Sequence, residues 1–321
     1  MNIGLLVSNL TNPAFLFFIL GLISVRLKSD LEIPPNSSKF ISLYLLFSIG
    51  LKGGQELAHS HFTVGIIWSV LFGITLASII PLYTFFILKR KMNIADSGAI
   101  AAAYGSVSAV TFVTAVSFLE IQKLSFDGYM VAIMALMEAP AIIIGVILIK
   151  LHDANGADAP KLGKVVRHSL TNGSVLLILG SLVIGFMASE QQAQGIKPFI
   201  TDIFKGFLAI FLLDMGITSG KKLGDFLKNG WFTTLFALIV PLFNGIVCAA
   251  ISGFITSDPG NRFIFSILAA SASYIAVPAA MKIAVPQANP GIYLPMALAI
   301  TFPINITIGM PIFLSVIQYW K

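Results

Sequence analysis

Two short hydroxyl-rich stretches interrupt otherwise apolar parts of this 321-residue chain. The sequence GSVSAVT occupies residues 105–111 and SASYIAVP occupies residues 271–278, and each contains two serines separated by one residue. A membrane helix that unwinds loses backbone hydrogen bonds, and lipid offers no replacement. Such breaks are therefore tolerated only inside protein or beside a wet cavity. A matched pair of interruptions is typical of the binding site of a secondary transporter.

The chemistry that we expect at the two interruptions is anion binding. An unwound helix presents the free N–H groups of its second half, where the helix dipole is positive. Serine and threonine hydroxyls can donate to an oxyanion or accept from a cation. Small residues also let helices pack closely, which is the alternative explanation for either stretch alone. The predicted anion-binding residues are Gly105, Ser106, Val107, Ser108, Thr111, Ser271, Ala272, Ser273 and Tyr274.

Two carboxylates lie well inside apolar stretches, Glu138 and Asp214. Carboxylates within a membrane are costly and usually functional, and Pro140 disturbs the helix next to Glu138. Because hard cations prefer oxygen ligands, we predict a Na⁺ site nearby. For Asp214, a helix–helix hydrogen bond or a salt bridge with Lys52 remains an alternative. The predicted Na⁺ ligands are Glu138, Asp214, Ser108 and Asn305.

The composition indicates a polytopic helical membrane protein. The chain is 57% hydrophobic and 11% charged, whereas soluble domains have roughly 25% charged residues. Apolar stretches of about 20 residues recur, and each is long enough to cross about 30 Å of hydrocarbon. A β-barrel would show alternating segments instead. We predict ten membrane spans, at residues 5–25, 38–53, 64–88, 96–119, 129–151, 173–188, 199–217, 231–255, 262–284 and 292–319.

Charge and motifs narrow the class further. Most of the 20 Lys and Arg residues fall in loops that join an odd span to the next even one. The positive-inside rule places these loops in the cytoplasm and both termini outside a bacterial plasma membrane. The net charge of +6 therefore reflects loop charges and not nucleic-acid binding. Hydrolytic and nucleotide-binding motifs are absent, so an enzyme is not expected, and the single Cys248 excludes a disulfide.

The two halves of the sequence match at a nearly constant offset of 163 to 166 positions. The matching pairs are residues 49–57 with 215–223, Ser106 and Ser108 with Ser271 and Ser273, and Gly128 and Pro140 with Gly291 and Pro303. Five spans in each half force the halves into opposite orientations, which is the inverted-repeat plan of secondary transporters. We predict an all-α fold with a five-helix repeat at 1–151, a cytoplasmic linker at 152–172 and a second five-helix repeat at 173–321. The fourth and ninth helices should be broken.

The sequence resembles the sodium-dependent bicarbonate permease family, known from cyanobacteria, over almost its full length. The resemblance rests on residues 49–54, 105–111, 129–141, 269–273 and 285–293, together with the Met-Gly pair of the seventh span. It implies a ten-span inverted repeat that binds its anion and Na⁺ between the broken helices. It also implies Na⁺ as the coupling ion, no organic cofactor, and a homotrimer with an elevator-like movement. By motif position, the implied site is Gly105–Ser108 with Ser271–Ser273, and Glu138 stands where the family carries an acid.

The sequence also departs from the family pattern. Tyr274, Ala276 and the Val277–Pro278 pair stand where close relatives of the cyanobacterial type carry an Asp and a Gly–Pro pair. Asp214 stands at a position that is apolar in those relatives. The loop between the halves is short, which argues against regulation by a soluble trimer of the nitrogen-regulatory type.

From these features we expect a membrane protein that takes up a small inorganic anion, bicarbonate foremost, together with Na⁺. Two alternatives remain open. One is a cation/proton exchanger in which Asp214 and Glu138 carry protons. The other is a transport-inactive membrane sensor in which Tyr274 fills the cleft.

Overall fold

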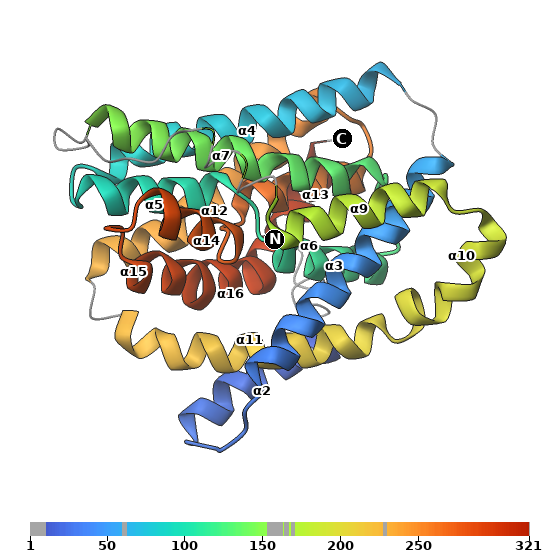
Figure 1. The fold of residues 1–321 in the computed structure, drawn as a ribbon, viewed down its shortest axis with the longest axis horizontal. Coiled ribbons are helices and arrows are strands. Elements are labelled where there is room, and N and C mark those ends of the chain that lie inside the picture. The colour runs from blue at the N-terminus through green and yellow to red at the C-terminus, as the bar shows by residue number, and fades with distance from the viewer. Residues whose placement is uncertain are drawn as a thin grey trace.

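The structure is a computed structural model that describes residues 11–59, 63–152, 163, 167, 171–226 and 230–320. This part of the chain forms helices and no strands, and most helices run across Figure 1. Residues 5–10 of the first predicted span and most of the predicted linker at 152–172 lie outside the described residues. Every predicted span otherwise corresponds to a helix, a pair of helices or a continuous helical run.

The first half contains α2 (Pro13–Arg26), α3 (Pro35–Ala58), α4 (Val64–Leu88), α5 (Ile94–Gly105), α6 (Ala109–Ile121) and α7 (Tyr129–His152). The second half begins with α9 (Gly173–Met187), α10 (Glu190–Lys197), a π-helical turn (Pro198–Asp202), α11 (Phe204–Phe226) and α12 (Trp231–Ile251), which ends in a 3₁₀ turn (Ser252–Phe254). It continues with α13 (Pro259–Ala270) and α14 (Ala276–Ala284). The last helical run consists of α15 (Pro290–Pro295), a π-helical stretch (Met296–Thr301), α16 (Phe302–Ile304), a π-helical turn (Asn305–Gly309) and α17 (Met310–Tyr319).

The predicted breaks in the fourth and ninth spans are confirmed. Helix α5 ends at Gly105 and α6 begins at Ala109, so residues 106–108 form the first break. Helix α13 ends at Ala270 and α14 begins at Ala276, so residues 271–275 form the second break. Ser106 and Ser271, the first residue of each break, both have extended backbone angles.

The helices that lead into the two breaks are built alike. Both α5 and α13 contain 12 residues, and their ends are 165 positions apart in the chain. The side chain of Asn93 accepts a hydrogen bond from Asp96 N at 2.7 Å, and the side chain of Asp258 accepts one from Asn261 N at 2.7 Å. These N-caps also lie 165 positions apart, and each satisfies an N–H group that has no partner within its helix.

The helices pack as two groups. In one, which we term the four-helix body, α2 packs along α11 and α3 along α9. In the other, the crossing body, α4, α5 and α7 pack together, and α12 and α13 pack with the last helical run. Beyond the breaks the halves exchange partners, because α6 packs on α13 and α14 packs on α5 and α7. In the predicted repeat, α2 corresponds to α9 and α3 corresponds to α11. Exchanging the halves therefore converts the α2–α11 pair into the α9–α3 pair. This exchange relation is the one that a repeated five-helix unit predicts.

Glycines allow the helices of the four-helix body to approach closely. A Cβ atom at Gly216 of α11 would lie 2.1 Å from the carbonyl oxygen of Phe18 in α2. A Cβ atom at Gly54 of α3 would lie 2.1 Å from the carbonyl oxygen of Leu182 in α9. Small residues at such crossings replace the hydrophobic effect as the source of contact between helices in lipid.

Within the described residues, five helical segments are long and apolar enough to cross a membrane, namely Val64–Leu88, Ile94–Ile121, Tyr129–His152, Trp231–Phe254 and Pro290–Tyr319. The segment that contains the first break is 89% buried over its most apolar window, against 33% for α4 and 39% for α12. Thus α4 and α12 present apolar side chains outward, and the broken helix lies inside. Helices α3 and α11 are more polar. Their Lys52, Asp214 and Lys221 side chains line cavities between the two bodies.

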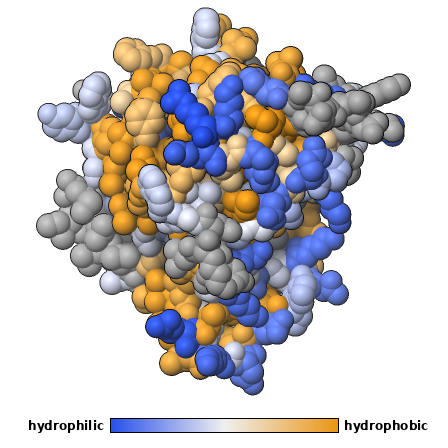
Figure 2. Space-filling view, turned by 90° about the vertical axis from the view of Figure 1, so that its left-hand side faces the viewer, coloured by the Kyte–Doolittle hydropathy of each residue, from blue (hydrophilic) through white to orange (hydrophobic). Residues whose placement is uncertain are grey.

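One end of the molecule has a polar face. Helices α4, α7 and α11 end, and α5 and α12 begin, at the left-hand end of Figure 1. Lys89, which caps α4, Lys150 in the last turn of α7 and Lys221 of α11 lie toward these helix ends. Figure 2 views this end and shows hydrophilic residues gathered across the face, with apolar residues on its flanks. A polar end framed by apolar sides is the surface pattern expected of a protein embedded in a bilayer.

The close approach of α2 and α11 predicts that Gly216→Ala destabilises the fold. The added methyl group meets backbone, which cannot move aside like a flexible side chain, so we expect a loss of about 1–3 kcal/mol. Gly206→Ala is the matched control, because a Cβ atom at Gly206 of the same helix meets nothing within 4 Å. The measurement is thermal unfolding in detergent, followed by a thiol dye that reaches the buried Cys248 on unfolding. Equal melting temperatures for the two variants would contradict the assigned packing.

Candidate functional site

The two breaks contact each other directly. Ser108 N in the first break donates to Ser271 Oγ in the second at 3.0 Å. Ser273 N in the second break donates to the carbonyl oxygen of Ala103, near the end of α5, at 2.8 Å. The breaks are therefore held together by hydrogen bonds from the backbone of each. The two breaks thus meet inside the protein, where unwound backbone is tolerated in a membrane protein.

Three of the predicted serine hydroxyls stabilise helix ends. Ser108 Oγ accepts from Thr111 N at 3.1 Å and so caps α6, and Ser273 Oγ accepts from Val277 N at 3.3 Å at the start of α14. Ser271 Oγ donates to the carbonyl oxygen of Leu268 at 3.0 Å. A hydroxyl that accepts one hydrogen bond still has a hydrogen to donate. Ser108 and Ser273 can therefore serve both the helix end and an anion, whereas Ser271 already donates its hydrogen.

Three buried oxygens at the crossing have no hydrogen-bond partner. They are Ser106 Oγ, Glu138 Oε2 and Asn305 Oδ1. The amide nitrogen of Asn305 donates to the carbonyl oxygen of Ala270 at 2.7 Å, which places this side chain at the end of α13. Buried polar atoms are nearly always paired, so each of these oxygens needs an explanation. Of these three oxygens, Glu138 Oε2 belongs to a residue that lines a cavity at the breaks, whereas Ser106 lies in the first break and Asn305 at the end of α13. Other buried side-chain atoms also lack a partner, on Ser48, Gln55, Ser69, Ser97, Asn244 and Arg262.

A small cavity joins the predicted residues of both breaks to Glu138. Its volume is about 10 Å³, close to the smallest space that holds one water molecule. We call it the crossing cavity. The residues that line it are Val107, Ser108, Ala109, Glu138, Ser174, Ser273, Tyr274, Ile275 and Ala276. Ser174 was missed at the sequence level, because its position in the first turn of α9 carries no pattern beyond an N-cap by Asn172.

Two helix N-termini open at the crossing cavity. Helix α6 begins at Ala109, and its first backbone bond within the helix runs from Phe112 N to Ser108 O at 3.0 Å. The N–H groups of Ala109 and Val110 therefore have no partner within α6. Helix α14 begins at Ala276, which also lines the cavity. Both termini carry the positive end of a helix dipole, which favours an anion.

Other predicted anion-binding residues shape the site in different ways. A Cβ atom at Gly105 would lie 2.1 Å from Pro81 Cγ, so this glycine allows α5 to pack against α4. Ala272 is buried in the second break, and the backbone of Thr111 is bound to the Ser108 hydroxyl. These residues determine the backbone path and do not line the crossing cavity.

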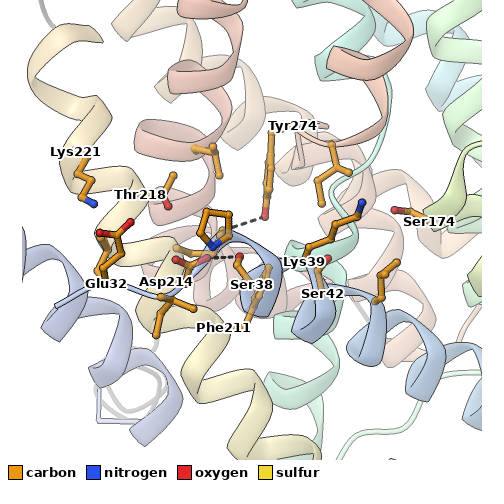
Figure 3. A pocket seen from close by; sticks show the side chains of 17 residues that line it. Glu32, Ser38, Lys39, Ser42, Ser174, Phe211, Asp214, Thr218, Lys221 and Tyr274 are labelled. Carbon is orange, nitrogen blue, oxygen red and sulfur yellow. Dashed lines mark hydrogen bonds between the residues drawn. The ribbon is translucent and has the colours of Figure 1, made fainter.

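Asp214 lies apart from Glu138. It lines a larger cavity of about 510 Å³, which we call the vestibule, and Ser38 Oγ donates to its carboxylate. Figure 3 shows this pair near the middle of the vestibule, with Lys39 and Lys221 on opposite sides. The hydrogen bond that the sequence left open for Asp214 is therefore present, and Lys52 pairs elsewhere. The four predicted Na⁺ ligands do not form one group, because only Glu138 and Ser108 line the crossing cavity.

Ion pairs connect the two bodies far from the vestibule. Glu120, in the last turn of α6, contacts Lys52 Nζ of α3 at 3.3 Å through Oε1 and Lys205 Nζ of α11 at 3.2 Å through Oε2. In α3, Lys52 is 14 positions beyond Ser38, which corresponds to about 20 Å along the helix axis. A cavity of about 290 Å³ lies beside these ion pairs. The crossing thus lies between the vestibule at one end and the Glu120 ion pairs at the other.

Comparison with known proteins identifies the family. A family model described as the Na⁺-dependent bicarbonate transporter superfamily matches residues 13–318, and the chain therefore belongs to this superfamily. No curated protein matches the chain. The matched range contains both breaks, Glu138, Asp214 and the Glu120 ion pairs.

The contact between the breaks predicts that Ser271→Ala destabilises the protein. The change removes the oxygen that accepts from Ser108 N and leaves a buried N–H group unpaired, at a cost of about 1–3 kcal/mol. Ser97→Ala is the matched control, because Ser97 is a fully buried serine of α5 whose hydroxyl has no partner. Thermal unfolding should show a lower midpoint for Ser271→Ala alone. The same midpoint for both variants would argue that the Ser108–Ser271 bond is absent.

Proposed function

We propose that this protein is a secondary active transporter that couples the uptake of a small inorganic anion, bicarbonate foremost, to Na⁺. The observation that carries the proposal is the crossing cavity, where the N-termini of α6 and α14 meet the buried carboxylate of Glu138. Membership in a superfamily of Na⁺-dependent bicarbonate transporters supports it. The site thus combines features that attract an anion with a carboxylate that attracts a cation.

We assign anion binding to backbone N–H groups and serine hydroxyls at the crossing. The free N–H groups of Ala109 and Val110 donate to the anion, and the hydroxyl hydrogens of Ser108 and Ser273 add to them. Ser106 Oγ, buried without a partner in the first break, is a further donor. Bicarbonate is small and planar with three oxygens, so several donors can reach it at once. The present cavity has space for about one water molecule, so binding requires the walls to move apart.

We assign Na⁺ binding to the Glu138 carboxylate with neighbouring oxygens. Glu138 Oε2 is buried and unpartnered, and Ser108 lines the same cavity. Asn305 offers another unpartnered oxygen at the end of α13. An anion beside an ionised Glu138 would be repelled strongly, because the interior screens charges weakly. Na⁺ at Glu138 removes this repulsion, and by reciprocity a bound anion strengthens Na⁺ binding to the same extent.

The membrane arrangement is part of the same proposal. We place ten spans in the plasma membrane as two inverted five-helix repeats, with both termini outside and the vestibule open to the cytoplasm. The crossing body then moves against the four-helix body, and a homotrimer holds the latter in place. The grouping of the helices into two bodies supports the proposed movement of one body against the other.

A cation/proton exchanger is the second candidate, and one observation favours it. Glu138 is a buried carboxylate without a partner, which is the property that a proton carrier in a membrane needs. In an exchanger Glu138 would bind a proton and a cation in turn, and the helix N-termini would have no anion to hold. The sensor alternative instead predicts no net transport of either ion.

Uptake by purified protein in liposomes tests the proposal. We expect radiolabelled bicarbonate to accumulate when an inward Na⁺ gradient is present and to stop when choline replaces Na⁺. A pH-sensitive dye inside the same vesicles reports proton exchange. Na⁺-driven pH change without bicarbonate uptake would support the exchanger and reject symport. Vesicles that show neither signal would support the sensor.

The assignment of Glu138 predicts that Glu138→Gln weakens the response to Na⁺. The amide keeps the size of the side chain and removes the charge, so the Na⁺ concentration for half-maximal uptake should rise by at least about tenfold, or about 1.4 kcal/mol. Glu190→Gln is the control, because Glu190 is an exposed residue of α10 at the molecular surface. An unchanged Na⁺ response in Glu138→Gln would remove this residue from the cation site.

A further inference from the structure

Tyr274 lies between the two cavities that face each other across the second break. The vestibule of about 510 Å³ and the crossing cavity of about 10 Å³ share three lining residues, Ser174, Tyr274 and Ile275. Tyr274 has the largest side chain of the three. A few side chains, among them the Tyr274 ring, therefore form the wall between the vestibule and the crossing cavity.

The Tyr274 side chain also crosses the seam between the two bodies. The residue belongs to the second break, within the crossing body, and its hydroxyl donates to Met215 Sδ of α11 at 3.8 Å. Figure 3 shows the ring extending from the break into the vestibule toward α11, close to the Ser38–Asp214 pair. A thioether sulfur is a weak acceptor. The contact therefore positions the ring without fixing it permanently.

The sequence departs from its own repeat at this residue. With the offset of 165 that relates α5 to α13, Tyr274 corresponds to Ala109, the first residue of α6. In the second half, α14 does not begin until Ala276, so Tyr274 and Ile275 extend the break by two residues. A small helical residue in one half is thus replaced by a bulky residue in irregular backbone in the other. Packing of the break alone does not require such a ring, because the first break is closed by small residues.

We propose that Tyr274 is the gate between the vestibule and the crossing site, and that its ring limits the size of the anion that passes there. Swinging the ring away joins the two cavities without moving a helix. Closure at the Glu120 end is of a different kind, because the ion pairs there link α6 to α3 and α11 and open only when the bodies separate. The identity of the anion rests on the proposed function, whereas the position of the gate rests on the two cavities.

Cysteine accessibility tests the gate without any need for transport. The only native cysteine, Cys248, is first replaced by Ala, and Ser273→Cys then reports access to the crossing cavity. Ser42→Cys reports access to the vestibule, which it lines. A negatively charged methanethiosulfonate reagent is added to each reporter with Tyr274, Tyr274→Phe or Tyr274→Ala. The melting temperature of every variant is measured alongside.

With Tyr274→Ala, we expect the Ser273→Cys reporter to react about tenfold faster. This ratio corresponds to about 1.4 kcal/mol in the free energy of opening the path to the thiol. Tyr274→Phe keeps the ring and should remain within about threefold of the parent, and the Ser42→Cys reporter should not change. Equal rates at Ser273→Cys for Tyr274 and Tyr274→Ala overturn the proposal. A rise at both reporters, with a lowered melting temperature, also overturns it, because general loosening then explains the access. If Tyr274→Ala fails to fold, Tyr274→Leu replaces it with the same expectations.

Substrate size provides the second readout. In liposomes, Tyr274→Ala should let acetate and propionate compete with bicarbonate uptake severalfold better than they do in the parent protein. If the parent takes up no bicarbonate, the proposed function fails while the cysteine result still decides the gate. If the cysteine rates rise and competition does not change, the gate stands and its role in size selection is rejected.

Discussion

The structure depends on how two unwound membrane helices replace the backbone hydrogen bonds that they lose. Within a bilayer each unpaired N–H or carbonyl group is costly, so a single break would be a defect. Here each break donates a backbone N–H group to the opposite half, Ser108 N to Ser271 Oγ of the second break and Ser273 N to the carbonyl oxygen of Ala103 near the end of α5. These bonds form only when the two breaks lie side by side, so they determine where α5 and α6 cross α13 and α14. The packing around them keeps water and lipid away, and the same exclusion strengthens any charge interaction at the site.

Much of this arrangement could be predicted from the sequence because local patterns encode it. The serine pairs mark both breaks, and apolar stretches of membrane length mark the helices. The roles of the hydroxyls could not be predicted in the same way. Whether Ser108 and Ser273 face a ligand or cap a helix depends on the backbone angles of the residues that follow. The partner of Asp214 is equally hidden, because Ser38 lies 176 positions away. Contacts over such distances leave no local pattern.

The two halves share a plan and differ in chemistry at the site. Helices α5 and α13 match in length and capping, yet the first half contributes Glu138 and the second contributes Tyr274 to the crossing cavity. Symmetric backbones create two equivalent helix N-termini, and either suits an anion. Side chains then make the site directional, because one half adds a negative charge and the other adds an aromatic wall. The repeat therefore sets the backbone frame of the site, and the residues that differ between the halves set its chemistry.

The seam between the bodies combines close packing with exposed ion pairs. Close glycine packing occurs within the four-helix body and also across the seam, since a Cβ atom at Gly128, next to α7, would lie 2.1 Å from the carbonyl oxygen of Gly53 in α3. Across the seam, Glu120 meets Lys52 and Lys205, and all three side chains are at least a third exposed. Exposed ion pairs are worth about 0–1 kcal/mol each, so the closed state gains little from them. The proposed movement of one body against the other must therefore separate the Gly53–Gly128 contact as well as the ion pairs, and Na⁺ with an anion would shift that balance only by their difference in affinity for the two states.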